Sequence, residues 1–308
     1  MIHTPAPRRR RTMSGGFLNR PSVVPYMFIL PFLIYFLLVY LYPFIATIIM
    51  SFQRIDGPNA ISFIGLDNFS RMFRQRNYFQ AIETTMRYAA WDLLILVPVP
   101  LLFAVLLRSS VVKLPGFFKS LFFMPALTSI IVAGIVFRLA FGTLDTSLVN
   151  LLTGMFGMPA RQWLMDAGTG NFVLVLLTLW RWLGVNIIYY YSGLQAIPED
   201  LYEAARIDGA NTAQQFAHIT LPGIKPVIIY VTTLTVMGGF SMFTESVALW
   251  EQKNPGGIGR TIVGYMYQTG FYKNNFGMAS AVGLTLLGLI LVVNLVQLGL
   301  MGFFKKEV

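Results

Sequence analysis

Five charged residues interrupt long apolar runs of this sequence: Asp92, Arg138, Arg181, Lys225 and Glu245. A charge at the centre of a bilayer costs at least about 2.5–3.5 kcal/mol, so such side chains usually face protein or a water-filled path. Arg181 stands between two tryptophans, and Glu245 lies near the end of a later run. These residues therefore predict either polar ligand contacts inside a membrane protein or a structural Arg–Glu pair.

Catalytic motifs are missing from the sequence. No Gly-x-x-x-x-Gly-Lys-Ser/Thr phosphate loop occurs, so the chain does not supply an ATP site. His3 and His218 are the only histidines and there is no cysteine, which leaves no His-Glu-x-x-His zinc site and no thiol chemistry. We predict that the chain is not an enzyme and holds no cofactor or metal of its own.

The elements that must position the charged residues are six apolar runs. Of the 308 residues, 56% are apolar or aromatic and 12% are charged, with a mean hydropathy of +0.64. A helix needs roughly 20 apolar residues to cross a bilayer. The runs that reach this length cover 25–50, 88–107, 121–141, 171–192, 224–248 and 279–304. We predict an all-α, polytopic membrane protein with six transmembrane helices.

Prolines interrupt three of these runs. Pro31 and Pro43 lie in the first, Pro98 and Pro100 in the second, and Pro125 in the third. Each proline lacks a backbone N–H and leaves a carbonyl without its helical partner. Lipid cannot bond that carbonyl, so a neighbouring helix or water must do so.

Both chain ends are predicted to lie in the cytoplasm. Residues 1–24 read as a flexible basic tail with four consecutive arginines, Arg8 to Arg11. The apolar run after it is far longer than the 7–15 residues of a signal peptide's apolar segment, so we expect a retained helix. The tail cluster sets the orientation, and residues 25–304 then form one six-helix transmembrane domain followed by a cytoplasmic C-terminus, 305–308. The net charge of +10 is scattered over loops, which argues against nucleic acid.

Two segments on the outer side carry local signals. The mixed polar and aromatic stretch from Arg71 to Glu83 predicts a helix lying on the bilayer surface. The run Asn254-Pro255-Gly256-Gly257 predicts a turn.

The cytoplasmic loop 195–222 has the pattern of two short helices. Pro198 suits a first helical turn, and Gly209 can adopt the positive φ that ends a helix. A second helix is expected to begin near Asn211 or Thr212 and to end before Pro222. The first helix carries small residues, which let another protein's backbone approach closely. The loop therefore fits a docking surface, although an ordinary alanine-rich linker gives the same pattern.

The spacing Glu-Ala-Ala, three residues, Gly, nine residues, Ile-x-Leu-Pro resembles the coupling loop of permease subunits of binding-protein-dependent ABC importers. The matching residues are Glu203, Ala204, Ala205, Gly209, Ile219, Leu221 and Pro222. The resemblance implies a MetI-like fold, a second permease subunit that completes a heterodimer, and an extracellular solute-binding protein. It also implies an ABC ATPase dimer that carries ATP and Mg and contacts the matching residues.

Other segments resemble the carbohydrate branch of this family. Phe123-Met124-Pro125-Ala126-Leu127 is one of them, and Gly264-Tyr265-Met266-Tyr267-Gln268 is most similar to arabino-oligosaccharide permeases of Gram-positive bacteria. A sugar site needs hydrogen-bonding groups and flat aromatic surfaces. The candidates for a sugar pathway are Trp180, Asn186, Tyr189, Ser241 and Glu245. The same residues also fit a structural ion pair with aromatic residues at the membrane interface.

Two alternatives stay open. The permease could serve another sugar or a sugar derivative such as glycerol phosphate. From a different class, a self-sufficient secondary transporter or channel would predict internal repeats and an ion site built by broken helices. Neither feature is evident, and that reading leaves the Glu-Ala-Ala loop unexplained.

Overall fold

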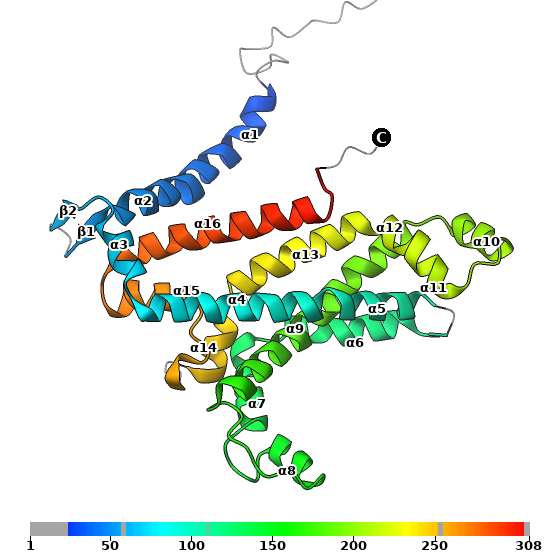
Figure 1. The fold of residues 1–308 in the computed structure, drawn as a ribbon. Helices are drawn as coiled ribbons and strands as arrows, with labels where there is room; N and C mark the ends of the chain where they lie inside the picture. Colours follow the sequence, from blue (N-terminus) through cyan, green and yellow to red (C-terminus); the bar gives the residue numbers. More distant parts are fainter. Residues whose placement is uncertain (1–23, 57–59, 110, 252–254, 305–308) are drawn as a thin grey trace, which may run out of the picture. The chain divides into compact units, whose positions relative to one another are not determined.

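The computed structural model describes residues 24–56, 60–109, 111–251 and 255–304 in two units, Met1–Met50 and Ser51–Val308. All of the predicted basic tail except Val24, and the C-terminal residues 305–308, lie outside the described residues. The described part of the first unit is an apolar helix. It consists of α1 (Val24–Tyr35), the π-helical segment η2 (Phe36–Leu41) and α2 (Tyr42–Ser51) (Figure 1).

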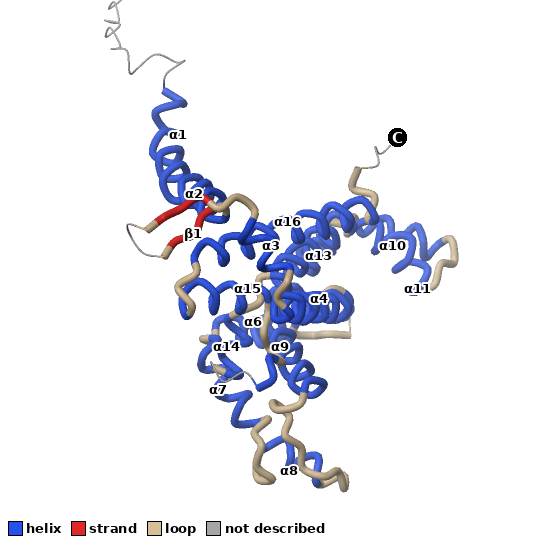
Figure 2. Tube along the Cα trace, turned by 60° about the vertical axis from the view of Figure 1, so that its left-hand side comes forward, coloured by secondary structure: helices blue, strands red, loops and turns tan. Residues whose placement is uncertain are grey.

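The second unit begins with a short hairpin, and helices joined by loops make up the rest of its described residues (Figure 2). Strands β1 (Gln53–Ile55) and β2 (Ile61–Phe63) pair antiparallel. The longer helices that follow are α3 (Asp67–Phe73), α4 (Arg76–Leu96), α5 (Pro98–Arg108), α6 (Pro115–Leu127), α7 (Ile130–Ala140), α8 (Leu148–Gly154), α9 (Ala167–Gln195), α10 (Glu199–Ile207), α13 (Lys225–Phe240), α14 (Thr244–Trp250), α15 (Ile262–Tyr267) and α16 (Phe276–Leu300). Shorter helical segments are α11 (Thr212–Gln215), η3 (Phe216–Thr220), α12 (Leu221–Gly223), η4 (Pro255–Gly257) and η5 (Gln268–Tyr272).

Four helical stretches are long and apolar enough to cross a membrane: Pro25–Ser51, Arg76–Arg108, Ala167–Gln195 and Phe276–Leu300. Two bent helix pairs bring the number to six if each pair counts as one span. The described residues thus agree with the predicted all-α membrane protein. The stretch from Arg71 to Glu83 was predicted to lie on the bilayer surface, but its residues from Arg76 onward belong to the long helix Arg76–Arg108.

Two predicted spans are not continuous helices. Within 121–141, α6 and α7 meet at a bend of 94°, because Thr128 is extended and Ser129 is also non-helical, with ψ 129°. Within 224–248, α13 ends at Phe240 and α14 starts at Thr244. Two adjacent glycines directly before Phe240 weaken the helix there.

The start of α9 is fixed by its N-cap. The Asp166 carboxylate accepts hydrogen bonds from the backbone N–H groups of Thr169 (3.1 Å) and Gly168 (2.9 Å). These bonds satisfy donors that a helix start leaves unpaired. They also hold the pKa of Asp166 below its usual value.

Helix α9 is the central packing element of the second unit. It lies against α4, α5 and α6, and Leu174, Ile187 and Tyr190 on it are fully buried. At Gly184 the backbones of α9 and α6 approach so closely that a Cβ atom would stand 2.0 Å from the carbonyl oxygen of Phe122. A glycine at this position therefore permits the α6–α9 contact.

We expect Gly184→Ala to destabilise the protein by about 1–3 kcal/mol, the usual cost of overpacking. The matched control is Gly288→Ala on α16, where an added Cβ meets nothing within 4 Å. Thermal unfolding of the purified protein should show a lower Tm for the first variant only. Equal Tm values for both variants would contradict the packing described at Gly184.

Candidate functional site

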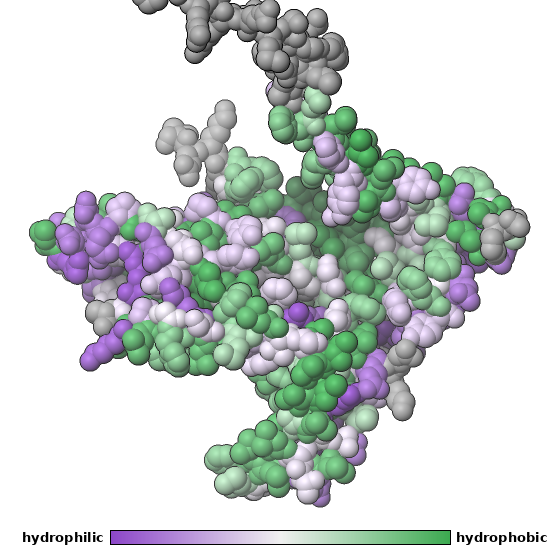
Figure 3. All heavy atoms as spheres, turned by 180° about the vertical axis from the view of Figure 1, so that it is seen from behind, coloured by the Kyte–Doolittle hydropathy of each residue, from purple (hydrophilic) through white to green (hydrophobic). Residues whose placement is uncertain are grey.

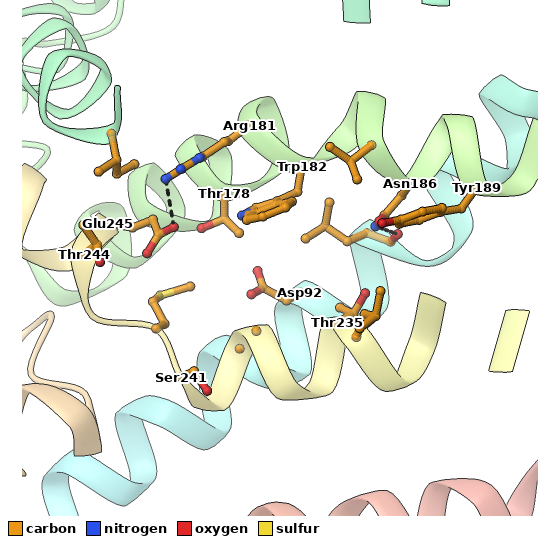
Figure 4. Close-up of a pocket in the computed structure, with 17 residues that line it drawn as sticks. Asp92, Thr178, Arg181, Trp182, Asn186, Tyr189, Thr235, Ser241, Thr244 and Glu245 are labelled. Atoms are coloured by element: carbon orange, nitrogen blue, oxygen red, sulfur yellow. Dashed lines mark hydrogen bonds and ion pairs between the residues drawn. The ribbon is translucent and has the colours of Figure 1, made fainter. Parts of the chain in front are cut away.

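A cavity of about 460 Å³ lies between α4, α9, α13 and the start of α14 (Figure 4). Its polar and aromatic lining residues are Asp92, Thr178, Arg181, Trp182, Asn186, Tyr189, Thr235, Ser241, Thr244 and Glu245. A volume of this size can hold a sugar unit or more. The cavity combines hydroxyl, amide and charged groups with two aromatic rings, which is the set of groups that carbohydrate binding requires.

One ion pair crosses the cavity. The guanidinium of Arg181 lies 3.5 Å from a carboxylate oxygen of Glu245, and both side chains are largely buried, with 22% and 13% of their surfaces exposed. Arg181 also stacks on the ring of Trp182, at 5.6 Å from the ring centroid. The Arg–Glu pair considered from the sequence is therefore present, and it lies within the cavity.

Asp92 on α4 points into the same cavity (Figure 4). Asp92 is only 2% exposed, and its Oδ1 atom has no hydrogen-bond partner among the described residues. The sequence marks Asp92 as a charge inside an apolar run but does not select it for the pathway. A lone carboxyl group in a membrane helix was the signal that could have found it.

Asn186 lines the cavity and also bonds a backbone carbonyl of α4. Its side-chain amide donates a hydrogen bond of 3.0 Å to the backbone carbonyl of Leu96. Pro100 lies four residues after Leu96 and has no N–H, so it cannot give that carbonyl its helical partner. A neighbouring helix thus supplies the missing donor, as membrane burial requires.

Four of the five residues predicted for the sugar pathway line this cavity. Asn186, Tyr189, Ser241 and Glu245 all line the cavity. Trp180 does not, because it packs on Phe137 with ring centroids 5.7 Å apart.

Trp182 takes the place predicted for Trp180. At 100° per residue, two positions along α9 turn a side chain to the opposite side of the helix. The lining residues Thr178, Trp182, Val185 and Tyr189 follow the spacing of three or four that marks one helix face. That spacing would have selected the correct tryptophan.

The loop after α9 forms two helical segments, α10 and the run α11–η3–α12. Gly209 ends the first with φ +82°, and Asn211 caps the second in a reciprocal capping box with Gln214. Both features match the expectation. The second segment does not end before Pro222, however, since Pro222 lies in the first turn of α12, where a proline is tolerated.

The coupling loop, as we call residues 195–222, is anchored to the rest of the second unit through Arg108 at the end of α5. Arg108 donates hydrogen bonds to the carbonyl of Leu194 and to Glu199, the latter at 3.0 Å. Its guanidinium also lies over the ring of Tyr202, 5.1 Å from the centroid. The side chains of α10 and α11 give this end of the molecule a hydrophilic surface (Figure 3).

The residues that match the importer pattern lie along this loop. Glu203 is exposed and approaches Arg206 at 4.0 Å, while Ala204 and Ala205 stand beside it on α10. Ile219 lies in η3, and Leu221 and Pro222 begin α12.

The family model of the binding-protein-dependent transport system inner membrane component matches residues 5–306, and the chain belongs to that family. The arabinooligosaccharides transport system permease protein AraP of Bacillus subtilis (strain 168) is 50% identical, over 93% of this chain and 91% of that protein. AraP of Halalkalibacterium halodurans is 46% identical, over 99% and 95%. The crystal structure of a bacterial ABC transporter involved in the import of the acidic polysaccharide alginate has a similar chain, with a TM-score of 0.81, 23% identity and coverage of 92% and 96%.

These matches confirm the predicted family, its carbohydrate branch and the MetI-like membrane fold. The chain is a multi-pass membrane protein, and its relatives are permease subunits rather than enzymes.

We expect Asn186→Leu to cost about 1–3 kcal/mol of stability, because it leaves the buried Leu96 carbonyl without a partner. Pro100→Ala supplies the N–H that is missing at that turn, so the same substitution should cost less in the Pro100→Ala background. Thermal unfolding of the four proteins of this double-mutant cycle measures the coupling. An equal loss of Tm in both backgrounds would show that Asn186 does not replace the helical donor.

Proposed function

We propose that this chain forms part of the membrane path by which an ABC importer carries arabino-oligosaccharides into the cell. The observation that carries the proposal is the polar, aromatic cavity between α4, α9, α13 and α14 in a chain that is 50% identical to an AraP permease. A sn-glycerol-3-phosphate permease is 27% identical, so a sugar derivative is the second candidate substrate.

In this proposal the sugar lies in the cavity. Trp182 and Tyr189 offer aromatic faces to the apolar side of a sugar ring, and Glu245, Ser241 and Thr244 offer hydrogen-bonding groups to its hydroxyls. One N–H of the Asn186 amide is committed to Leu96, so its second N–H and its Oδ1 atom remain for a ligand.

The coupling loop is the proposed contact with the ATPases. The two helices that line most of the cavity flank this loop, since α9 ends at Gln195 and α13 starts at Lys225, after a bend of 70° from the preceding helical segment. A partner that shifts the loop would therefore move both sides of the cavity.

The remaining parts of the importer are proposed from the family. They are a second permease subunit in a heterodimer, an ABC ATPase dimer and an extracellular solute-binding protein. A similar alginate transporter was crystallised with an alginate pentasaccharide-bound periplasmic protein, which supports the last of these. ATP and Mg belong to the partner ATPase in this scheme, and both termini of this chain lie in the cytoplasm.

Purification separates the proposal from a self-sufficient transporter. The chain should co-purify with a second permease and an ATPase, and uptake of arabinotriose should require all of them together with ATP. Uptake by this chain alone in liposomes would contradict the proposal.

We expect Glu245→Ala to reduce sugar-stimulated ATP hydrolysis at least tenfold while the importer still assembles, because Arg181 loses its partner and the cavity loses an acceptor. Glu83→Ala is the matched control on α4. It removes an exposed carboxylate that pairs with Arg87 at 2.8 Å. Unchanged stimulation in Glu245→Ala would remove Glu245 from the sugar path.

Gly209→Val should abolish ATPase association while membrane insertion persists, because a β-branched residue at φ +82° is strained and distorts the loop. Gly157→Val is the control for that strain. Gly157 has φ +76° and, like Gly209, nothing within 4 Å of an added Cβ, but it lies before α9. Co-purification of the ATPase should be lost in the first variant alone; loss in both would point to general misfolding.

A further inference from the structure

The cavity between α4, α9, α13 and α14 has an unbalanced set of charges. Only three of its lining residues are charged: Asp92, Arg181 and Glu245. Two carboxyl groups therefore share the space with one guanidinium, and each comes from a different helix.

The charge of the single cation is already balanced. Arg181 pairs with Glu245 at 3.5 Å and its guanidinium lies over Trp182, while its Nε–H has no hydrogen-bond partner among the described residues. The described residues that line the cavity include no lysine, no histidine and no second arginine. A negatively charged group that entered the cavity would therefore find no cation there whose charge is not already balanced. An anion removed from water without a counter-charge is strongly disfavoured.

Asp92 adds a directed polar group to this arrangement. It is 2% exposed, it points into the cavity, and its Oδ1 atom has no hydrogen-bond partner among the described residues (Figure 4). Buried polar atoms in membrane proteins are normally bonded, so water or a ligand group that enters the cavity must supply the partner of this one. Sugar hydroxyls donate hydrogen bonds and carry no charge, so they can bond Asp92 without adding an anion.

We infer that Asp92 and the Arg181–Glu245 pair select uncharged oligosaccharides and exclude those that bear a carboxylate or a phosphate. The inference rests on the proposed function, because it assigns a substrate class to the same cavity. It does not depend on whether Asp92 holds its proton, since Arg181 stays paired with Glu245 in both states. Relatives of this chain include permeases named for polygalacturonan and for glycerol phosphate, which are acidic substrates. The charges in the cavity of this chain would then favour neutral over acidic substrates.

The test is equilibrium binding of two probes to the assembled importer without its binding protein, so that only the membrane cavity discriminates. The neutral probe is arabinotriose and the acidic probe is trigalacturonate. The variant Asp92→Asn with Glu245→Gln leaves Arg181 as the only charge in the cavity. The control, Glu83→Gln with Asp145→Asn, changes the net charge equally at two exposed positions.

The wild type should bind arabinotriose and reject trigalacturonate. The cavity variant should bind trigalacturonate at least tenfold more tightly than the wild type does, while the control variant should not. Glu245→Gln alone, which removes the partner of Arg181 in either protonation state of Asp92, should shift the preference in the same direction by a smaller factor. It keeps the test usable if the double variant does not assemble.

The contradicting results are distinct. Unchanged rejection of trigalacturonate by the cavity variants, or an equal gain in the control, overturns the charge selection and leaves the sugar site intact. Failure of the wild-type importer to bind arabinotriose overturns the proposed sugar site, and the charge selection falls with it.

Discussion

The fold of the second unit depends on one constraint: polar groups buried among apolar helices must find partners on other helices. Asn186 bonds the carbonyl that Pro100 leaves unpaired, and Thr85 accepts a hydrogen bond of 2.8 Å from the backbone N–H of Ile262. Such bonds fix α4 against α9 and against the start of α15. Among the described residues, Asp92 and Arg181 are two whose buried polar atoms lack such a partner, and both line the cavity.

The same constraint explains how the cavity and the coupling loop are related. Helices α9 and α13 are the two ends of the loop, and together they contribute most of the lining side chains. Arg108 on α5 bonds the end of α9 at Leu194 and the loop at Glu199, which anchors the loop to the helices beside it. In the proposed function, a displacement of Glu203 and Gly209 reaches the sugar site through α9 and α13, the helices that flank the loop.

The sequence predicted the family and the helical membrane fold, because long apolar runs and the Glu-Ala-Ala spacing are local patterns. It also predicted the caps at Gly209 and Asn211. The bend between α6 and α7 was not predicted, since hydropathy reports length and composition but not backbone direction. The composition of the segment does not distinguish Trp180 from Trp182, because both are neighbours of Arg181. Only the helix face on which each lies separates them, and Trp182 is the one on the cavity side.

In the proposed function, sugar passes through the cavity of this subunit. A cryo-electron microscopy structure of the assembled importer would show whether it does, with the importer held with ATP by a hydrolysis-deficient ATPase and supplied with arabinotriose-loaded binding protein. We predict density for the sugar between Trp182, Asp92 and Glu245. Density confined to the partner permease, with this cavity closed, would contradict the claim.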